Sequence, residues 1–261
     1  MSGNGKIRLE RDKLGLAVLT LDSPPLNLFE RSMFEGLVGL VDEVESHPPR
    51  GLLIRAEGRA VSGGVDVNEF DGLSPEQARE LWEELLGLVD RVERLPLPTV
   101  FAAHALTLTA AFELALSCDL IVAAESARFG LVERVVGLTP SMGGTQRLAE
   151  RAGSSRAAEL VMTGELYGAE ELQRWGVVNF VFGDEEFDDR ARSFATTLAT
   201  GPTKAHAMTK HILRRFREGG VAAADDAVRE DAGDLFATED LRSAVKTFLE
   251  KGPGHAEFEG R

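Results

Sequence analysis

The 261-residue sequence has few of the features that mark disulfide-linked, secreted or membrane proteins. Its one cysteine, Cys118, cannot form a disulfide within the chain. No stretch approaches the roughly 20 consecutive apolar residues of a membrane-spanning helix. The N-terminus also lacks the apolar core of a signal peptide. We therefore expect a cytoplasmic protein with no membrane partner.

Basic residues and paired metal ligands are also scarce. Lys and Arg number 29 against 43 Asp and Glu, which gives a formal net charge of -14. Nucleic-acid binding generally needs a basic surface, so no nucleic-acid partner is expected. His206 and His211 point to different faces of a helix, so no metal is expected. Gly143-Gly144 does not match the dinucleotide-binding fingerprint, so no nicotinamide cofactor is expected.

Apolar runs of strand length alternate with helical periodicity along most of the chain. Strands are predicted at 16–21, 51–55, 99–103, 120–124 and 177–181, and helices at 29–44, 75–94, 154–162 and 169–175. Ser74 and Gln77 form a capping box that begins the second of these helices. The alternation predicts parallel strands and an α/β core over 1–200. Region 201–261 is mainly helical in pattern, with new helices at Val221 and after Thr238, and its apolar stripes favour oligomerisation.

Glu113 is the most unusual acidic residue, because apolar side chains surround it in a predicted helix. Those neighbours are Ala110, Ala111, Phe112, Leu114, Ala115 and Leu116. A helix that is apolar nearly all round is usually buried, and burial raises a carboxyl pKa toward neutral pH. Glu113 is therefore a candidate acid or base. Alternatively, it binds an arginine or a backbone donor and is structural.

Two further segments have site-like features. Glu133 also lies among apolar residues, in the segment 129–140. Gly63-Gly64 follows a predicted strand, where glycine allows a ligand to approach the backbone closely. An ordinary turn explains the glycine pair equally well.

Four ordered stretches resemble the crotonase (enoyl-CoA hydratase/isomerase) superfamily. They are residues 19–27, 60–66, 113–120 and 129–148, and the last, with Pro140 and Gly-Gly-Thr-Gln-Arg-Leu, is the most specific. The resemblance implies an α/β fold, a crotonase-like spiral of repeated β-β-α units with a C-terminal helical trimerisation region. It also implies an acyl-CoA thioester as substrate and assembly as a homotrimer or a dimer of trimers. Coenzyme A would be part of the substrate, and no separate cofactor is implied.

The same resemblance assigns roles to individual residues. Glu113 would orient and activate water, and Glu133 would exchange a proton with the α-carbon. The backbone N–H groups of Gly63 and Ala110 would form the oxyanion hole, the pair of donors that polarises the thioester oxygen. Contacts to substrate or CoA are expected from Leu26, Ser62, Gly64, Val65, Asp66, Val67, Pro140 and Ser141.

The chain departs from the family pattern around the first glutamate. Thr109-Ala110-Ala111 replaces a run of glycines, and Ser141 replaces a common glycine. His104-Ala105 stands where Asn-Gly is common. An alanine N–H donates as well as a glycine N–H, whereas the added methyl groups narrow the site. His104 either contacts the ligand or only stabilises its loop.

The retained pair of glutamates, 20 residues apart, favours an enoyl-CoA hydratase. Such an enzyme adds water to a 2-trans-enoyl-CoA and gives a 3-hydroxyacyl-CoA, in fatty-acid or related acyl-CoA metabolism. One alternative is double-bond isomerisation or another crotonase-type acyl-CoA reaction. A second is a non-catalytic acyl-CoA-binding or RNA-associated scaffold, which the basic patch at Arg214–Arg217 and the missing glycines favour.

Overall fold

A seven-stranded sheet forms the centre of the computed structural model, which describes residues 2–3 and 6–261. In spatial order its strands are β1 (Ser2–Gly3), β2 (Ile7–Arg11), β3 (Leu16–Leu21), β4 (Gly51–Ala56), β5 (Thr99–Ala103), β7 (Leu120–Ala124) and β10 (Phe180–Phe182). From β3 to β10 neighbouring strands are parallel, and β1 and β2 are antiparallel additions at one edge. The predicted α/β core is confirmed.

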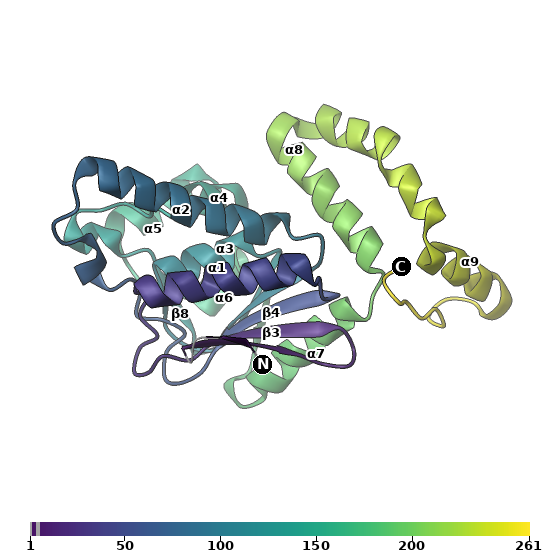
Figure 1. Cartoon of the computed structure of the whole chain (residues 1–261), viewed down its shortest axis with the longest axis horizontal. Helices are drawn as coiled ribbons and strands as arrows, with labels where there is room; N and C mark the ends of the chain where they lie inside the picture. The colour runs from purple at the N-terminus through teal and green to yellow at the C-terminus, as the bar shows by residue number, and fades with distance from the viewer. Residues whose placement is uncertain (1, 4–5) are drawn as a thin grey trace.

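Helices cover both faces of this sheet. Helices α1 (Arg31–Ser46), α2 (Pro75–Arg94) and α3 (Ala110–Ser117) lie over one face, and α7 (Phe187–Ala199) lies under the other (Figure 1). Strand β3 is buried at every position, as expected of a strand covered on both sides. Helix α2 keeps the predicted bounds, and its capping box joins Ser74 to Gln77 in both directions.

The site lies beside a smaller sheet and three further helices. The sheet contains β6 (Thr107–Leu108), β8 (Arg128–Gly130) and β9 (Tyr167–Gly168). The helices are α4 (Gly144–Ala152), α5 (Ser154–Thr163) and α6 (Ala169–Arg174). Helix α3 runs from β6 toward β7 and contacts α4, so it connects the small sheet to the core.

Two predicted boundaries are wrong because backbone hydrogen bonds to neighbouring segments displace them. Phe29 was expected to begin a helix, but its N–H donates to the Gly64 carbonyl at 2.9 Å and α1 begins at Arg31. The strand expected at 177–181 is β10, which begins only at Phe180. The N–H groups of Val177 and Val178 instead donate to the Leu172 carbonyl at the end of α6. Strand β2 and helix α7 were not predicted.

Buried Asn27 joins two loops at the carboxyl ends of β3 and β4. Its side-chain nitrogen donates to the carbonyls of Glu57 and Ala60 at 2.8 and 3.0 Å. Its side-chain oxygen accepts from the Ser23 N–H at 2.6 Å, and its φ is +48°. Asparagine tolerates this left-handed conformation better than most residues. The loop at 57–64 is thereby fixed against the loop that follows β3.

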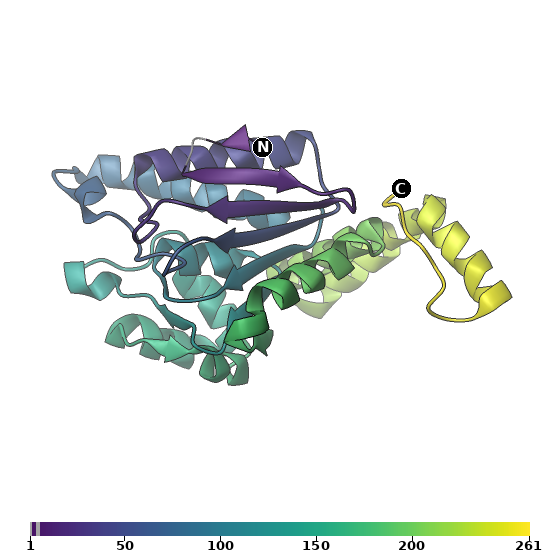
Figure 2. The same ribbon diagram turned by 90° about the horizontal axis from the view of Figure 1, so that it is seen from below.

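The C-terminal helices form an arm that projects from the core (Figures 1 and 2). The arm consists of α8 (Thr203–Glu230), a 3-10 helix (Ala232–Ala237) and α9 (Glu239–Lys251). Gly219 and Gly220 kink α8 just before Val221, and Thr238 caps α9, both as predicted. The division of the chain at residue 200 stays a prediction. Within the described part of the chain, no helix is long and apolar enough to span a membrane.

Candidate active site

Glu113 lies in the first turn of α3 and is 3% exposed. Its Oε1 accepts two backbone hydrogen bonds, from the Met142 N–H at 2.8 Å and the Gly144 N–H at 2.9 Å. These donors belong to the turn that begins α4, where a positive helix dipole also favours a carboxylate. Neither bond uses Oε2, so one carboxylate oxygen is held and the other is left for a second partner.

Burial raises the pKa of Glu113 to about 7. The two backbone donors and the positive charge of Arg147 lower this pKa, but burial is the larger effect. A carboxyl group that ionises near neutral pH suits proton transfer at that pH. The structural alternative is thus partly right, because Glu113 does bind backbone donors, although they satisfy only one of its oxygens.

The backbone around Gly144 leaves no room for a side chain. A Cβ at Gly144 would lie 2.7 Å from Cγ of Glu113. Buried Arg147, one turn along α4, pairs with Asp90 and Glu93 of α2, both at 2.7 Å. This network fixes the start of α4 against α2. The position of the Glu113 carboxylate therefore depends on three helices.

Glu133 begins a 3-10 helix (Glu133–Val136) and faces the same cavity as Glu113. Both of its carboxylate oxygens are buried, and neither accepts a hydrogen bond from the described residues. Burial first, and the charge of Glu113 second, raise the pKa of Glu133 to about 8. Two coupled carboxyls of this kind release their protons in separate steps. At neutral pH the pair can hold a carboxylate and a carboxylic acid together.

The cavity between these glutamates has a volume of about 160 Å³. Among the predicted site residues, Gly63, Val65, Val67, Glu113, Glu133 and Ser141 line it. The remaining walls, which were not predicted, are largely apolar: Phe70, Trp82, Leu85, Thr109, Val132, Val135, Val136, Leu138, Thr139 and Met142. Most of these residues are ordinary hydrophobic positions, which the sequence alone does not distinguish from core.

Five predicted contact residues do not line this cavity: Leu26, Ser62, Gly64, Asp66 and Pro140. Ser62 instead stabilises its own loop, because its hydroxyl donates to the Asn27 carbonyl at 2.7 Å and accepts from the Gly64 N–H at 2.9 Å. Asp66 caps a short 3-10 helix through the Asn68 N–H. Contacts from these five residues to a larger ligand stay a prediction.

The assignment of Gly63 as an oxyanion donor is wrong for this structure. Its N–H donates to the Leu26 carbonyl at 2.8 Å and is not available to a ligand. The Val65 N–H, two residues further on, lies 3.2 Å from the Thr109 hydroxyl oxygen. At the start of α3, the Ala110 N–H has no acceptor among the described residues. Of these three N–H groups, only that of Ala110 has no acceptor among the described residues, and that of Val65 is paired with the Thr109 hydroxyl.

Two other candidate features do not belong to the cavity. His104 lies 2.9 Å from the Gly58 carbonyl through its Nε2 and is a loop contact. The basic patch on α8 is neutralised, because Lys210, Arg214, Arg215 and Arg217 each pair with an acidic side chain. The RNA-associated scaffold therefore loses one of the two features that favoured it, the basic patch.

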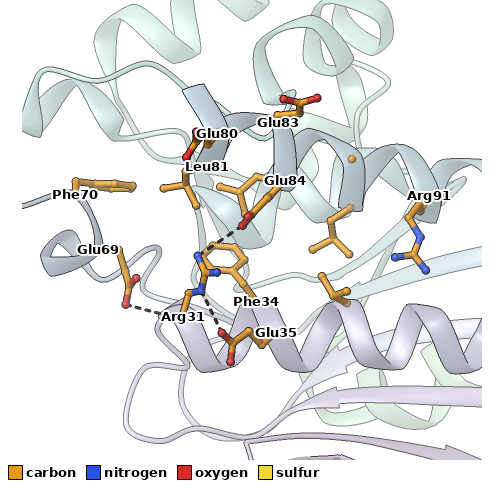
Figure 3. Close-up of a pocket in the computed structure, with 14 residues that line it drawn as sticks. Arg31, Phe34, Glu35, Glu69, Phe70, Glu80, Leu81, Glu83, Glu84 and Arg91 are labelled. Carbon is orange, nitrogen blue, oxygen red and sulfur yellow. Dashed lines mark hydrogen bonds and ion pairs between the residues drawn. The ribbon is translucent and has the colours of Figure 1, made fainter. Parts of the chain in front are cut away.

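A second hollow of about 740 Å³ lies between α1 and α2 (Figure 3). It shares Phe70 and Leu85 with the cavity at the glutamates. Five glutamates and two arginines line it: Glu35, Glu69, Glu80, Glu83, Glu84, Arg31 and Arg91. Arg31 pairs with Glu35 and Glu84, as Figure 3 shows, and Arg91 pairs with residues of α1. The hollow is therefore acidic, with its cations already paired.

Known proteins resemble this chain over nearly its whole length. The enoyl-CoA hydratase/isomerase family model matches residues 11–261. A Bacillus subtilis protein named "probable enoyl-CoA hydratase" is 32% identical over 242 residues, 90% of this chain and 93% of that protein. The 1,2-epoxyphenylacetyl-CoA isomerase of Escherichia coli is 31% identical, with 91% and 93% covered. The structure of a Bacillus anthracis enoyl-CoA hydratase superposes with a TM-score of 0.90 at 25% identity, covering 98% of this chain and 100% of that one.

The pKa of Glu133 makes stability depend on pH. Its ordinary value is 4.5 and its folded value about 8, so the folded state keeps a proton that the unfolded state releases. This contribution to stability is full below pH 4.5 and is lost as pH rises to about 8. We predict that Glu133→Gln raises the free energy of unfolding by on the order of 2 kcal/mol at about pH 9, with little effect at about pH 4.

Urea unfolding at the two pH values measures this difference. Glu165→Gln is the matched control, because Glu165 is exposed and its replacement removes no buried charge. A gain in stability for Glu133→Gln that is the same at both pH values would show that its carboxyl is not held in the protonated form.

Proposed function

The chain belongs to the enoyl-CoA hydratase/isomerase family, and we propose that it adds water across the 2-trans double bond of an enoyl-CoA thioester. The product is the 3-hydroxyacyl-CoA. The observation that carries this proposal is the pair of buried carboxyls, with pKa values of about 7 and 8, on one small apolar cavity. Water addition needs a base for the water proton and an acid for the α-carbon, and environments that separate two pKa values supply both.

The two glutamates take different roles in the proposed reaction. Glu113, whose Oε1 accepts two backbone hydrogen bonds that favour the carboxylate, is the base that removes a proton from water as the oxygen bonds to C3. Glu133, whose buried oxygens accept no hydrogen bond from the described residues, is the acid that donates a proton to C2 as the double bond is lost. The H and OH added to the double bond therefore come, in sum, from one water molecule. Proton exchange with solvent then returns Glu113 to the carboxylate and Glu133 to the carboxylic acid. The two amides that bind Oε1 of Glu113 leave Oε2 to hold the water.

Negative charge on the thioester oxygen rises during this addition. The Ala110 N–H at the start of α3 is suited to stabilise it, because this donor has no acceptor in the described part of the chain and the helix dipole favours negative charge there. A second donor is needed on the side of the loop that contains Val65, whose N–H donates to the Thr109 hydroxyl, whereas the Gly63 N–H donates to the Leu26 carbonyl. The largely apolar walls strengthen both interactions because they lower the local dielectric constant.

Isomerisation is the second candidate, supported by the resemblance to the Escherichia coli isomerase. Glu133 alone could remove a proton from one carbon and return it to another, because its carboxyl has no hydrogen-bond partner among the described side chains and backbone. Hydration is favoured because Glu113 is oriented by two backbone donors yet keeps one oxygen unused. A shuttle of one proton needs no second carboxylate of this kind.

The adjoining hollow limits the acyl group that we propose. It adjoins the cavity at Phe70 and Leu85, and we propose that a longer acyl chain extends past these side chains between α1 and α2. A carboxylate on that chain would meet five glutamates there, of which Arg31 pairs with only two, Glu35 and Glu84, while Arg91 pairs with Asp42 and Glu45 of α1. We therefore propose an uncharged acyl group. The absence of any separate cofactor and the cytoplasmic location stay predictions.

We also propose that the protein is a homotrimer or a dimer of trimers. The arm exposes large apolar side chains on all of its helices: Leu213, Phe216, Val221, Phe236, Val245, Phe248 and Leu249. The core cannot cover this surface, since the arm projects away from it (Figure 2). Association of copies would remove these side chains from water.

The reaction is tested by incubation with enoyl-CoAs in water enriched in heavy oxygen. We predict that the label appears in the 3-hydroxyl group of the product. A chain ending in a carboxylate should react at least about 10-fold more slowly than an uncharged chain of equal length, as expected for one uncompensated charge. A moved double bond without label would establish isomerisation instead, and an unchanged substrate would contradict both candidates.

Oligomerisation is tested by light scattering at micromolar concentration. We predict the mass of three or six chains for the native protein. The double substitution of Phe248→Asp and Leu249→Asp should lower this mass, because both side chains are exposed on the arm. Leu14→Asp is the control, since Leu14 is exposed on the core and not on the arm. A native protein that stays monomeric would contradict the proposal.

A further inference from the structure

Thr109, the residue just before α3, has a backbone conformation that threonine rarely adopts. Its φ is +46° and its ψ is -118°. A β-branched residue at positive φ is a strained outlier, and such strain is characteristic of functional sites. Glycine would adopt the same conformation without strain. The side chain of Thr109 is thus kept at a position whose backbone favours glycine.

Hydrogen bonds on both sides fix this backbone. The Thr109 N–H donates to the Gly130 carbonyl at 3.0 Å. The Thr109 carbonyl accepts from the Glu113 N–H at 2.8 Å, which closes the first turn of α3. The direction of the threonine side chain is therefore set by β8 on one side and by the helix carrying Glu113 on the other.

The Thr109 hydroxyl lies between the two sets of backbone donors at the cavity. Its Oγ1 accepts from the Val65 N–H at 3.2 Å, and Thr109 itself precedes Ala110, whose N–H is free. A Cβ at Gly64 would lie 2.6 Å from Oγ1, so the hydroxyl fills the space beside that loop. Thr109 lines the cavity and is 8% exposed. Its hydroxyl proton has no acceptor within the described part of the chain.

We propose that the Thr109 hydroxyl donates a hydrogen bond directly to the thioester oxygen, in place of the Val65 amide. The oxyanion is then held by Oγ1–H of Thr109 and by N–H of Ala110. The Val65 N–H acts through the hydroxyl, because a hydroxyl that accepts one hydrogen bond becomes a stronger donor in the next. The proton stays on Oγ1 throughout, and no covalent bond changes. This inference rests on the proposed function, since it requires an acyl-CoA thioester in the cavity.

A hydroxyl donor is suited to this position for two reasons. Hydrogen bonds from O–H to a charged oxygen are short and strong. The Val65 amide already has Oγ1 as its acceptor, so a ligand oxygen that used the amide directly would have to displace the hydroxyl. With the hydroxyl as donor, neither the loop nor the strained backbone of Thr109 has to move when substrate binds.

Three substitutions separate a donor from a residue that only fills space. Thr109→Val keeps the branched shape and removes the hydroxyl, and Thr109→Ser keeps the hydroxyl. We expect kcat for hydration to fall by about 10²–10³-fold in Thr109→Val, the usual loss of one oxyanion donor, and to change by less than about 10-fold in Thr109→Ser. Thr109→Gly should retain more activity than Thr109→Val, because it frees the Val65 amide to donate directly. KM should change little in all three.

Infrared spectroscopy of a bound saturated acyl-CoA, labelled with ¹³C at the thioester carbon, measures the carbonyl stretching frequency. A hydrogen bond to the thioester oxygen lowers this frequency, whereas a residue that only fills space would leave it unchanged. We expect the band to shift to lower frequency on binding to the native protein and to Thr109→Ser, and to shift less with Thr109→Val. Circular dichroism and urea unfolding check that each variant is folded.

Equal rates and equal carbonyl frequencies for Thr109→Val and Thr109→Ser would overturn the inference and leave Thr109 as a space-filling residue. Faster turnover by Thr109→Val or Thr109→Gly than by the native protein would also overturn it, because the hydroxyl would then block the oxyanion hole. If the native protein neither binds acyl-CoA nor hydrates any enoyl-CoA, the proposed function fails and this inference fails with it.

Discussion

The burial of one carboxylate, that of Glu113, is the constraint on which the site depends. It lies on a helix whose every residue is buried, and it receives two N–H groups from the start of α4. Those donors approach closely because Gly144 has no side chain, and Arg147 ties α4 to α2. An unpaired buried carboxylate would be costly, so the fold supplies partners for one oxygen and leaves the other to the cavity. The same arrangement that stabilises the fold creates the reactive group.

Glu133 completes this arrangement because its carboxyl has no hydrogen-bond partner among the described residues. Burial and the nearby Glu113 both favour its protonated form, so the pair resists full ionisation near neutral pH. The largely apolar walls maintain this state because they offer few polar partners to the carboxyl groups. One carboxylate and one carboxylic acid then face a space of about 160 Å³. The Ala110 N–H, which has no acceptor among the described residues, lies at the start of the helix that carries Glu113. The acid–base chemistry that we propose follows from the different surroundings of two identical side chains.

The sequence predicted most of the core and the principal charged residues, and it failed where distant segments decide the geometry. Apolar runs located β3, β5 and β7 because strands buried on both faces have few alternatives. Burial of Glu113 followed from its apolar neighbours. Gly63 was misassigned because its N–H donates to the carbonyl of Leu26, and no local sequence pattern predicts a hydrogen bond between residues so far apart in the chain. Thr109 was noted only as a replaced glycine, since its hydroxyl meets Val65 through the fold.

Two rates measured in Glu113→Gln and Glu133→Gln test most directly whether the two carboxyls act as base and acid. One is the rate of hydration, and the other is the rate at which the α-proton of a saturated acyl-CoA exchanges with deuterium in the solvent. Glutamine has nearly the same shape as glutamate but cannot transfer a proton at neutral pH. We predict that Glu133→Gln loses both hydration and exchange, by about 10²–10⁴-fold. Glu113→Gln should lose hydration to a similar extent and yet retain exchange. Turnover near the native rate in both variants would contradict the account, because the buried carboxyls would then be structural.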